Sequence, residues 1–282
     1  TCEFLEEELD EIYPGAGIKF PIDVQGSEYV FFPAVSDYLL EADTLMGNAA
    51  MRHAIGASWT IGSENFDGID YGLFYSDRMW ERIIKAQVAE IKRLGGRVML
   101  IGECGHASRS AKEGMQNFIP EEERLPVVNI MELAHAGFVS GELKLIENAI
   151  EQRTTYHDPC NIARKGWIVE QPRVLLRHIC SDFVEMTPNG VDNSCCGGGG
   201  GTVSIDEIRE FRVMVGGETK AEQIKATGAH FVVTPCANCK KQVSEIIEDF
   251  KLDVVRTGLH DLFLQAIIMP DGQKPEARRV FE

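Results

Sequence analysis

The chain has 282 residues, of which 44% are hydrophobic, and its formal net charge is -16 from 44 acidic and 28 basic residues. This composition is globular, and the length is sufficient for two domains that each bury a core. Nucleic acids and anionic membranes require a basic face, and the net negative charge argues against one. No apolar run approaches the roughly 20 residues of a membrane-spanning helix. We therefore expect no nucleic-acid partner and no direct membrane insertion.

Residues 1–26 open the chain as an acidic amphipathic helix end followed by a linker. The helical pattern of residues 1–13 stops at Pro14-Gly15, and residues 16–26 are typical of a linker. The pattern begins as though a helix were already under way, so we expect residues 1–26 to be the remainder of an upstream region. Cys2 is expected to be a stray thiol, with a leftover metal ligand as the alternative.

Residues 27–148 alternate buried strands with helices. Apolar runs predict strands over 29–32, 98–101 and 126–128, and helical patterns cover 36–57, 77–94 and 131–137. Gly95-Gly96 stops the second helix. A loop over 102–107 carries Cys104 and His106.

Residues 149–282 repeat this order. The run 154–156 leads to Pro159-Cys160 as 30–32 leads to Pro33-Ala34, and 221–236 repeats 89–104. The sequence therefore predicts an α/β protein of two tandem pseudo-symmetric repeats, each with a small, mostly parallel sheet and flanking helices.

The most informative stretch is Cys195-Cys196 followed by the glycines Gly197 to Gly201. Adjacent cysteines do not close an ordinary strain-free disulfide, but as thiolates they can hold neighbouring metal ions. Glycines let the backbone approach the bound group, and the amides of Gly197 and those that follow can donate to its sulfurs. We count Gly197 and Gly198 with the cofactor-binding residues.

Three further cysteines lie where loops are expected, and together with the pair they form a predicted five-cysteine site: Cys160, Cys195, Cys196, Cys236 and Cys239. A tetrahedral zinc ion has room for only four thiolates, whereas a multi-iron cluster can use the fifth as a bridge. The alternatives are structural zinc and, for Cys236-x-x-Cys239, a thioredoxin-like dithiol. Eight cysteines, mostly in one half, indicate a metal protein of a reducing compartment, hence cytoplasmic.

The first repeat lacks this set. It has Ala34 in place of Cys160, Asp67-Gly68 in place of Cys195-Cys196, and Ala107 in place of Cys239. Cys104 alone matches a ligand, Cys236. We predict a degenerate repeat without a cluster over 27–148 and a cluster-binding repeat over 149–282.

The pattern of Cys160, Cys195-Cys196-Gly197 and Cys236-x-x-Cys239 in the second of two repeats resembles the cysteine-rich CCG domain of the heterodisulfide reductase catalytic-subunit family. The glycine run and the segment 235–241 are most similar to the DsrK-type subunit of the sulfite-reduction-associated membrane complex. The resemblance extends over residues 28 to 282.

The resemblance implies one noncubane [4Fe-4S] cluster per chain, held by the five cysteines, in an oxidoreductase of dissimilatory sulfur metabolism that reduces a disulfide or trisulfide. The substrate is expected to be a small protein or a thiol-cofactor disulfide, and electrons are expected from the membrane electron-transfer subunits of a respiratory complex, at the inner face of the membrane. The family's own reductase uses a cluster in each repeat, and the membrane-complex branch has an N-terminal ferredoxin-like domain with Cys-x-x-Cys-x-x-Cys runs. Neither feature is in this sequence, so electrons are expected from a missing segment or another subunit.

Two other functions stay open. The same domain occurs in iron-sulfur electron-transfer subunits of lactate, glycolate or glycerol-phosphate dehydrogenases, and a zinc-stabilised interaction protein would have no redox role.

Four side chains are candidates for assisting catalysis. His157, three residues before Cys160, and Lys240, after Cys239, can deliver protons or steady a departing thiolate, with a loop hydrogen bond and a solvated surface charge as the alternatives. By internal symmetry Cys104 and His106 should face the cluster, as pocket residues or as remnants. Cys180 is expected in the core.

Overall fold

The computed structural model describes residues 2–68, 70 and 72–276. Thr1, which begins the predicted N-terminal segment, and residues 277–282, which end the predicted second repeat, lie outside the described residues.

A four-stranded parallel sheet forms the centre of the first repeat. Its strand order is β2-β1-β3-β4. The strands are β1 (Tyr29–Phe32), β2 (Trp59–Thr60), β3 (Val98–Ile101) and β4 (Val127–Asn129). The inner strands β1 and β3 are continuous apolar runs because helices cover both faces of a parallel sheet. All three strands predicted in this repeat are present.

The second repeat has the same topology, with strand order β7-β6-β8-β9 and all pairs parallel. The strands are β6 (Thr154–Tyr156), β7 (Phe183–Glu185), β8 (Phe231–Val233) and β9 (Val255–Thr257). In both sheets the first strand of the repeat lies inside, flanked by the second and third. The predicted α/β fold of two pseudo-symmetric repeats is confirmed.

Helices connect the strands of the first repeat. They are α2 (Val35–Leu39), α3 (Ala42–Ala54), α4 (Gly72–Tyr75), α5 (Asp77–Arg93), α6 (Gly105–Phe118) and α7 (Ile130–Ser140), with a 3-10 turn at Glu121–Glu123. The single helix predicted over 36–57 is wrong, because the chain breaks at Leu40-Glu41 and the Glu41 carboxylate turns to Arg256 of the second repeat, 2.6 Å away. The loop predicted over 102–107 is also shorter, since α6 begins at Gly105.

The second repeat has α8 (Cys160–Gly166), α9 (Glu170–Ile179), α10 (Glu218–Thr227), α11 (Ala237–Phe250) and α12 (Leu259–Phe263). Between β7 and α10 the chain makes 3-10 turns at Gly190–Asp192, Thr202–Ser204 and Asp206–Ile208 and a π-helical turn at Phe211–Val215. This irregular stretch contains the glycine run.

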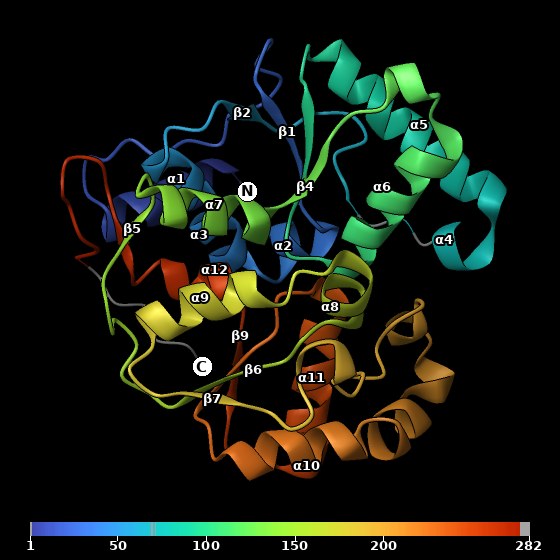
Figure 1. Ribbon diagram of the computed structural model, residues 1–282, viewed down its shortest axis with the longest axis vertical. Coiled ribbons are helices and arrows are strands. Elements are labelled where there is room, and N and C mark those ends of the chain that lie inside the picture. Colours follow the sequence, from blue (N-terminus) through green and yellow to red (C-terminus); the bar gives the residue numbers. More distant parts are fainter. Residues whose placement is uncertain (1, 69, 71, 277–282) are drawn as a thin grey trace.

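The two repeats pack against each other through matched pairs of helices. In Figure 1 the blue-to-green first repeat lies above the yellow-to-red second repeat, and α3 packs on α12, α7 on α9, and α6 on α8. Short strands β5 (Lys144–Leu145) and β10 (Ile267–Ile268) pair antiparallel across the same boundary. One apolar core includes residues of both repeats, so burial at the boundary stabilises the pair as a unit.

The N-terminal segment packs on this body. Helix α1 (Cys2–Ile12) buries Leu5, Leu9 and Ile12. Residues 16–26 differ from the predicted linker, because Ile18 and Phe20 are buried and Phe20 packs edge-on against Trp59. Apolar residues two apart favour this strand-like packing over a free linker.

No helix within the described ranges combines the length and the apolar character that crossing a bilayer requires.

Candidate metal centre

The structure brings the five predicted ligands together in a continuous row of sulfur contacts. Cys160 hydrogen-bonds to Cys195, and Cys195 to Cys196. The Sγ atoms of Cys196 and Cys239 are 3.2 Å apart, and Cys239 contacts Cys236 in turn. The row ends at Cys104 of the first repeat, whose thiol hydrogen-bonds to Cys236.

Helix starts position most of these thiols. Cys160 is the first residue of α8, and Cys239 lies in the first turn of α11. Cys104 and Cys236 are the N-cap residues of α6 and α11, both in extended conformation, and they meet across the boundary between the repeats. Helix N-termini favour negative charge, but hydrogen bonds between the thiols and burial outweigh this contribution at Cys104, Cys160 and Cys239, whose pKa values are raised.

The glycine run shapes the loop around Cys195 and Cys196. The Gly197 amide donates to Cys195 Sγ at 3.3 Å, and the Gly198 amide donates to Cys196 Sγ at 3.5 Å. Gly197, Gly200 and Gly201 have positive φ angles of 90°, 64° and 79°. A Cβ on Gly198 would lie 2.7 Å from the Gln242 Cβ. The loop therefore requires glycine for its conformation and for its close packing.

Hydrogen bonds between the sulfurs shift the pKa values of the thiols in opposite directions, because some sulfurs accept these bonds and others donate them. Hydrogen bonds from Cys160 and Cys196 lower the pKa of Cys195, and hydrogen bonds from Cys104 and Cys239 lower the pKa of Cys236. The pKa of Cys160 is raised, first by its hydrogen bond to Cys195 and then by burial. Cys195 and Cys236 are thus the sites where thiolate is most stable, at opposite parts of the row.

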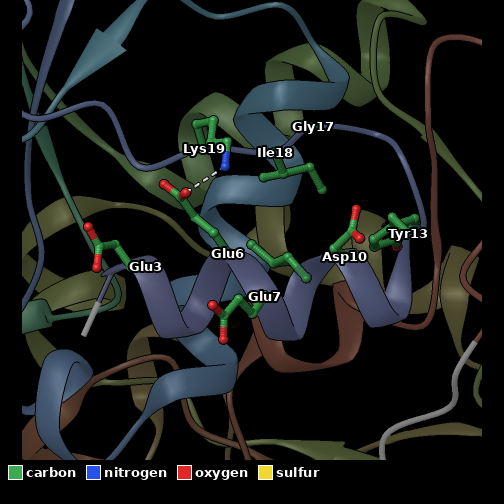
Figure 2. A pocket seen from close by; sticks show the side chains of 9 residues that line it. Glu3, Glu6, Glu7, Asp10, Tyr13, Gly17, Ile18 and Lys19 are labelled. Atoms are coloured by element: carbon green, nitrogen blue, oxygen red, sulfur yellow. Dashed lines mark hydrogen bonds and ion pairs between the residues drawn. The ribbon is translucent and has the colours of Figure 1, made fainter.

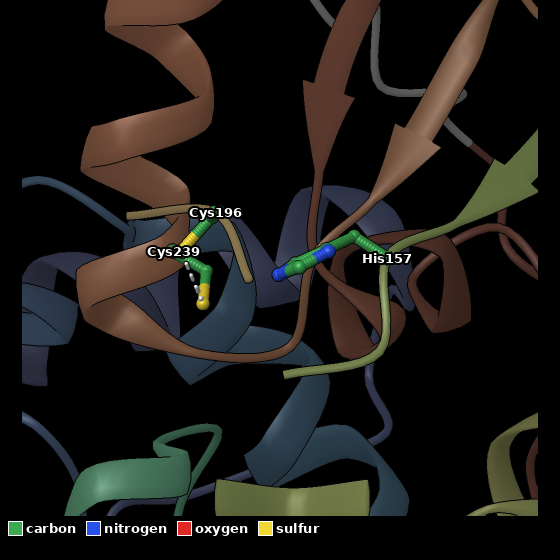
Figure 3. Close-up of side chains that lie close together, drawn as sticks. All are labelled: His157, Cys196 and Cys239. Carbon is green, nitrogen blue, oxygen red and sulfur yellow. Dashed lines mark hydrogen bonds between the residues drawn. The ribbon is translucent and has the colours of Figure 1, made fainter. Parts of the chain in front are cut away.

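His157 faces this row from the loop after β6. Its imidazole lies with the sulfurs of Cys196 and Cys239 in a group whose ligand atoms are all within 4.8 Å of one another, and Figure 3 shows the ring pointing at both. The side chain is buried, and neither ring nitrogen has a hydrogen-bond partner among the described residues. Burial lowers the pKa of His157 to about 3, so the ring is neutral. The predicted alternative, a loop hydrogen bond from this side chain, is absent from the described contacts.

The side chain of Lys240 lies in a buried ionic network. Its Nζ lies 3.6 Å from Glu41, 3.6 Å from Glu103 and 3.7 Å from Asp261, and it donates to Thr44. Although burial acts to lower it, these carboxylates, Asp261 first, hold the pKa of Lys240 above its usual value. The alternative of a solvated surface charge is wrong, because the side chain is buried between the repeats.

Cys104 and His106 lie beside the row, at the start of α6. Cys104 is fully buried. His106 Nε2 is 2.7 Å from the Asp70 carbonyl oxygen, and its ring packs 4.5 Å from that of Phe74. His106 lines the cavity beside the five cysteines, and Cys104 contacts Cys236, so both residues border the centre from the first repeat. Cys180 caps the end of α9 in the core, as predicted, and Cys2 is partly buried on α1, apart from the row.

One side of the row is open to solvent. A narrow cavity of about 20 Å³ is lined by the five cysteines together with Gly105, His106, Pro159, Asn161, Gly199 and Asn238. Cys195 is exposed and Cys160 half-buried, whereas Cys196, Cys236 and Cys239 are buried. An incoming molecule therefore meets Cys195 and the glycine loop first, and Cys104 lies at the closed end.

A wider groove elsewhere has different chemistry. It measures about 580 Å³, runs beside α1 and is lined by Glu3, Glu6, Glu7 and Asp10, with Lys19 paired to Glu6 at 2.7 Å (Figure 2). None of the cysteines, all of which are within the described residues, lines this groove, so we assign it no part in the centre.

The donor set fits an iron-sulfur cluster better than zinc. The five sulfurs of the row outnumber the four that one tetrahedral zinc ion takes, and amide donors aimed at two of them suit thiolate ligands of iron. The row is flanked by the amides of Gly197 and Gly198 and by the neutral imidazole of His157. Cys195, within the row, is exposed to solvent. The same residues can hold a cluster and leave one side of it accessible.

The sequence did not point to Lys220, a residue of α10 that is fully buried near the row. The thiols of Cys196 and Cys239 are among the groups that interact electrostatically with its ammonium group. Its position in a helix offers no signal, because lysine is ordinarily exposed.

Comparison with known proteins matches residues 154–244 to the family described as a cysteine-rich domain, CCG. The Hdr-like menaquinol oxidoreductase iron-sulfur subunit 2 of Archaeoglobus fulgidus is 26% identical over 98% of this chain and 58% of its own length. The Hdr-like menaquinol oxidoreductase iron-sulfur subunit of Archaeoglobus profundus is 28% identical over 94% of this chain and 54% of its own length. A subunit of the dihydromethanophenazine:CoB--CoM heterodisulfide reductase of Methanosarcina barkeri is 26% identical over 74% of this chain and 49% of its own. The chain thus spans about half the length of these relatives.

Proposed function

This chain carries a CCG cysteine-rich domain and is homologous to iron-sulfur subunits of heterodisulfide-reductase-like oxidoreductases, and we propose that it reduces the disulfide or trisulfide of a small protein or thiol cofactor. The observation that carries the proposal is the row of five cysteines, which is open to solvent at Cys195 beside the glycine loop. Electrons would come from membrane subunits of a respiratory complex at the inner face of the membrane.

Cys160, Cys195, Cys196, Cys236 and Cys239 would hold one noncubane [4Fe-4S] cluster in residues 149–282. When bound, the cluster supplies single electrons and an iron site that accepts sulfur. The Gly197 and Gly198 amides hold the thiolates of Cys195 and Cys196 in place. The first repeat, 27–148, binds no cluster and closes the centre through Cys104 and α6.

Cleavage of a disulfide breaks one sulfur-sulfur bond and consumes two electrons and two protons, giving two thiols. We propose that His157 holds the centre's sulfurs through its ring N–H, because it is the predicted catalytic side chain whose nitrogens face Cys196 and Cys239. Cys104 and His106 would shape the closed end, and Lys240 would hold the two repeats in register. Because Cys104 is fully buried, exchange between it and a substrate sulfur is no part of this proposal.

An electron-transfer subunit of a lactate, glycolate or glycerol-phosphate dehydrogenase is the second candidate. The narrow cavity of about 20 Å³ favours it, because passing electrons requires no room for a disulfide. A zinc-stabilised interaction protein is the third function, and metal content distinguishes it.

The deciding experiment adds oxidised glutathione, or a peptide disulfide, to the anaerobically purified and oxidised protein and records its electron paramagnetic resonance spectrum. The proposal predicts a new paramagnetic state that depends on the disulfide and disappears when the disulfide is replaced by its thioether analogue. An unchanged spectrum with an intact cluster would favour the electron-transfer subunit.

A further inference from the structure

Lys220 is a buried cation without a carboxylate partner. Its side chain is 0% exposed, and its Nζ donates to Met186 Sδ at 3.7 Å. Within the described part of the chain no carboxylate forms an ion pair with it. A thioether is a weak acceptor, and an ammonium group buried without an anion costs several kcal/mol. Some other negative charge must offset this cost.

The surroundings of Lys220 identify that charge. Met186 packs in the same apolar cluster as Cys196, Cys236 and Cys239. Burial lowers the pKa of Lys220 to about 8, and the thiols of Cys196 and Cys239 are the first groups that oppose the lowering. Among the groups that can carry negative charge, the cysteine row is therefore the one that acts most strongly on Lys220.

Asp158, the carboxylate that also acts on Lys220, is already satisfied. Its two oxygens accept from the Arg173 guanidinium at 2.8 and 2.7 Å, and one of them also accepts from the Gly190 amide at 2.7 Å. Arg173 also pairs with Glu185 at 2.9 Å, so the guanidinium that holds the buried Asp158 serves two carboxylates. Asp158 therefore has its own ion-pair partner, whereas Lys220 is buried beside the centre without one among the described residues.

We propose that Lys220 is the buried counter-charge of the five-cysteine centre and sets its reduction potential. The inference rests on the iron-sulfur centre of the proposed function. Several thiolates together with an added electron make the reduced centre more negative, and a fixed ammonium group in a medium of low dielectric stabilises that state. Lys220, whose Nζ contacts Met186, would act on the centre through its charge.

The test is a redox titration of the purified holoprotein followed by electron paramagnetic resonance. Lys220→Met keeps the length of the side chain and removes its charge, and we expect the equilibrium constant for one-electron reduction to fall at least tenfold, which is about 59 mV toward negative potential. Lys220→Arg should keep most of the potential. The matched control is Lys225→Met, because Lys225 is exposed on the same helix.

A Lys220→Met protein with a full cluster and the unmodified potential would overturn the inference. If Lys220→Met loses its iron, the iron content of Lys220→Arg distinguishes two explanations. Iron retained in Lys220→Arg supports the need for a positive charge, whereas iron lost from Lys220→Arg shows that Lys220 acts in packing. These outcomes are separate from failure of the proposed function. If the unmodified protein contains no iron and sulfide, the proposed iron-sulfur centre is wrong. If the centre is present but does not react with disulfides, its reduction potential can still be measured, so the inference about Lys220 can still be tested.

Discussion

At the scale of single residues, the centre depends on which sulfur each cysteine touches. Cys196 and Cys239 are the middle of the row, 3.2 Å apart and buried, with His157 beside them. Cys180 has the same chemistry but lies in the core at the end of α9, away from the row. Position, rather than cysteine content, therefore distinguishes the proposed ligands from Cys180.

Replacing either middle cysteine with serine should remove or convert the cluster. Serine has nearly the same size, but its oxygen is a harder donor that binds iron more weakly than thiolate. We expect Cys196→Ser and Cys239→Ser to lose most of the visible iron-sulfur absorption and at least half of the iron, measured on anaerobically purified protein. Cys180→Ser is the control and should keep both. Bleaching by Cys180→Ser with an intact Cys239→Ser would show that the ligand set is wrong.

At the scale of elements, the loop of Gly197 to Gly201 determines the shape of the centre. Two neighbouring glycines in it differ in what surrounds them. A Cβ on Gly198 would lie 2.7 Å from the Gln242 Cβ and 3.0 Å from the Asn238 carbonyl oxygen, whereas a Cβ on Gly199 would meet nothing within 4 Å.

Gly198→Ala should therefore displace the loop and the amide that donates to Cys196, while Gly199→Ala should fit. A contact of this kind costs about 1–3 kcal/mol, and we expect a lower iron content and faster loss of the cluster in air for Gly198→Ala alone. The measurement is the decay of visible absorption after exposure to oxygen. Equal decay in the two variants would contradict the role given to the Gly198 amide.

Strands and helices were predicted well where the hydrophobic pattern of the sequence is strong, and poorly where contacts between distant segments determine the local structure. The apolar runs of β1, β3 and β8 identify buried strands from sequence alone. The break between α2 and α3 does not follow from the local pattern, because it depends on an ion pair of Glu41 with Arg256 of the other repeat. Helix α6 was missed since Gly105 at its start reads as a loop residue, although Cys104 caps it.

The same distinction applies to the site. The five thiols and the glycine amides were predicted because their residue types and spacing allow little else. The orientation of His157, the burial of Lys240 and the presence of Lys220 depend on residues far apart in the sequence, which a single sequence does not place together.

At the scale of the whole molecule, a buried ionic network joins the two repeats beside the centre. Lys240 and His260 of the second repeat meet Glu41 and Glu103 of the first, with the His260 ring 2.6 Å from Glu103. Breaking a buried network by removing one partner leaves uncompensated charge, which is more destabilising than replacing the whole network.

Lys240→Met should lower the free energy of unfolding by about 3–5 kcal/mol, measured by urea denaturation of the anaerobically purified protein. Lys85→Met is the control, because Lys85 pairs with Glu81 on the exposed face of α5 and such a pair contributes about 0.3–0.5 kcal/mol. A loss under about 1 kcal/mol for Lys240→Met would show that the two repeats do not depend on this network.

The asymmetry between the repeats is the central claim: one iron-sulfur cluster in the second repeat and none in the first, where Ala34 and Ala107 offer no ligand atoms. Iron, zinc and acid-labile sulfide, counted per chain on anaerobically purified protein, test it most directly. The account predicts about four iron atoms and about four sulfides per chain, without stoichiometric zinc. About eight iron atoms from this chain alone, or one zinc ion without sulfide, would contradict it.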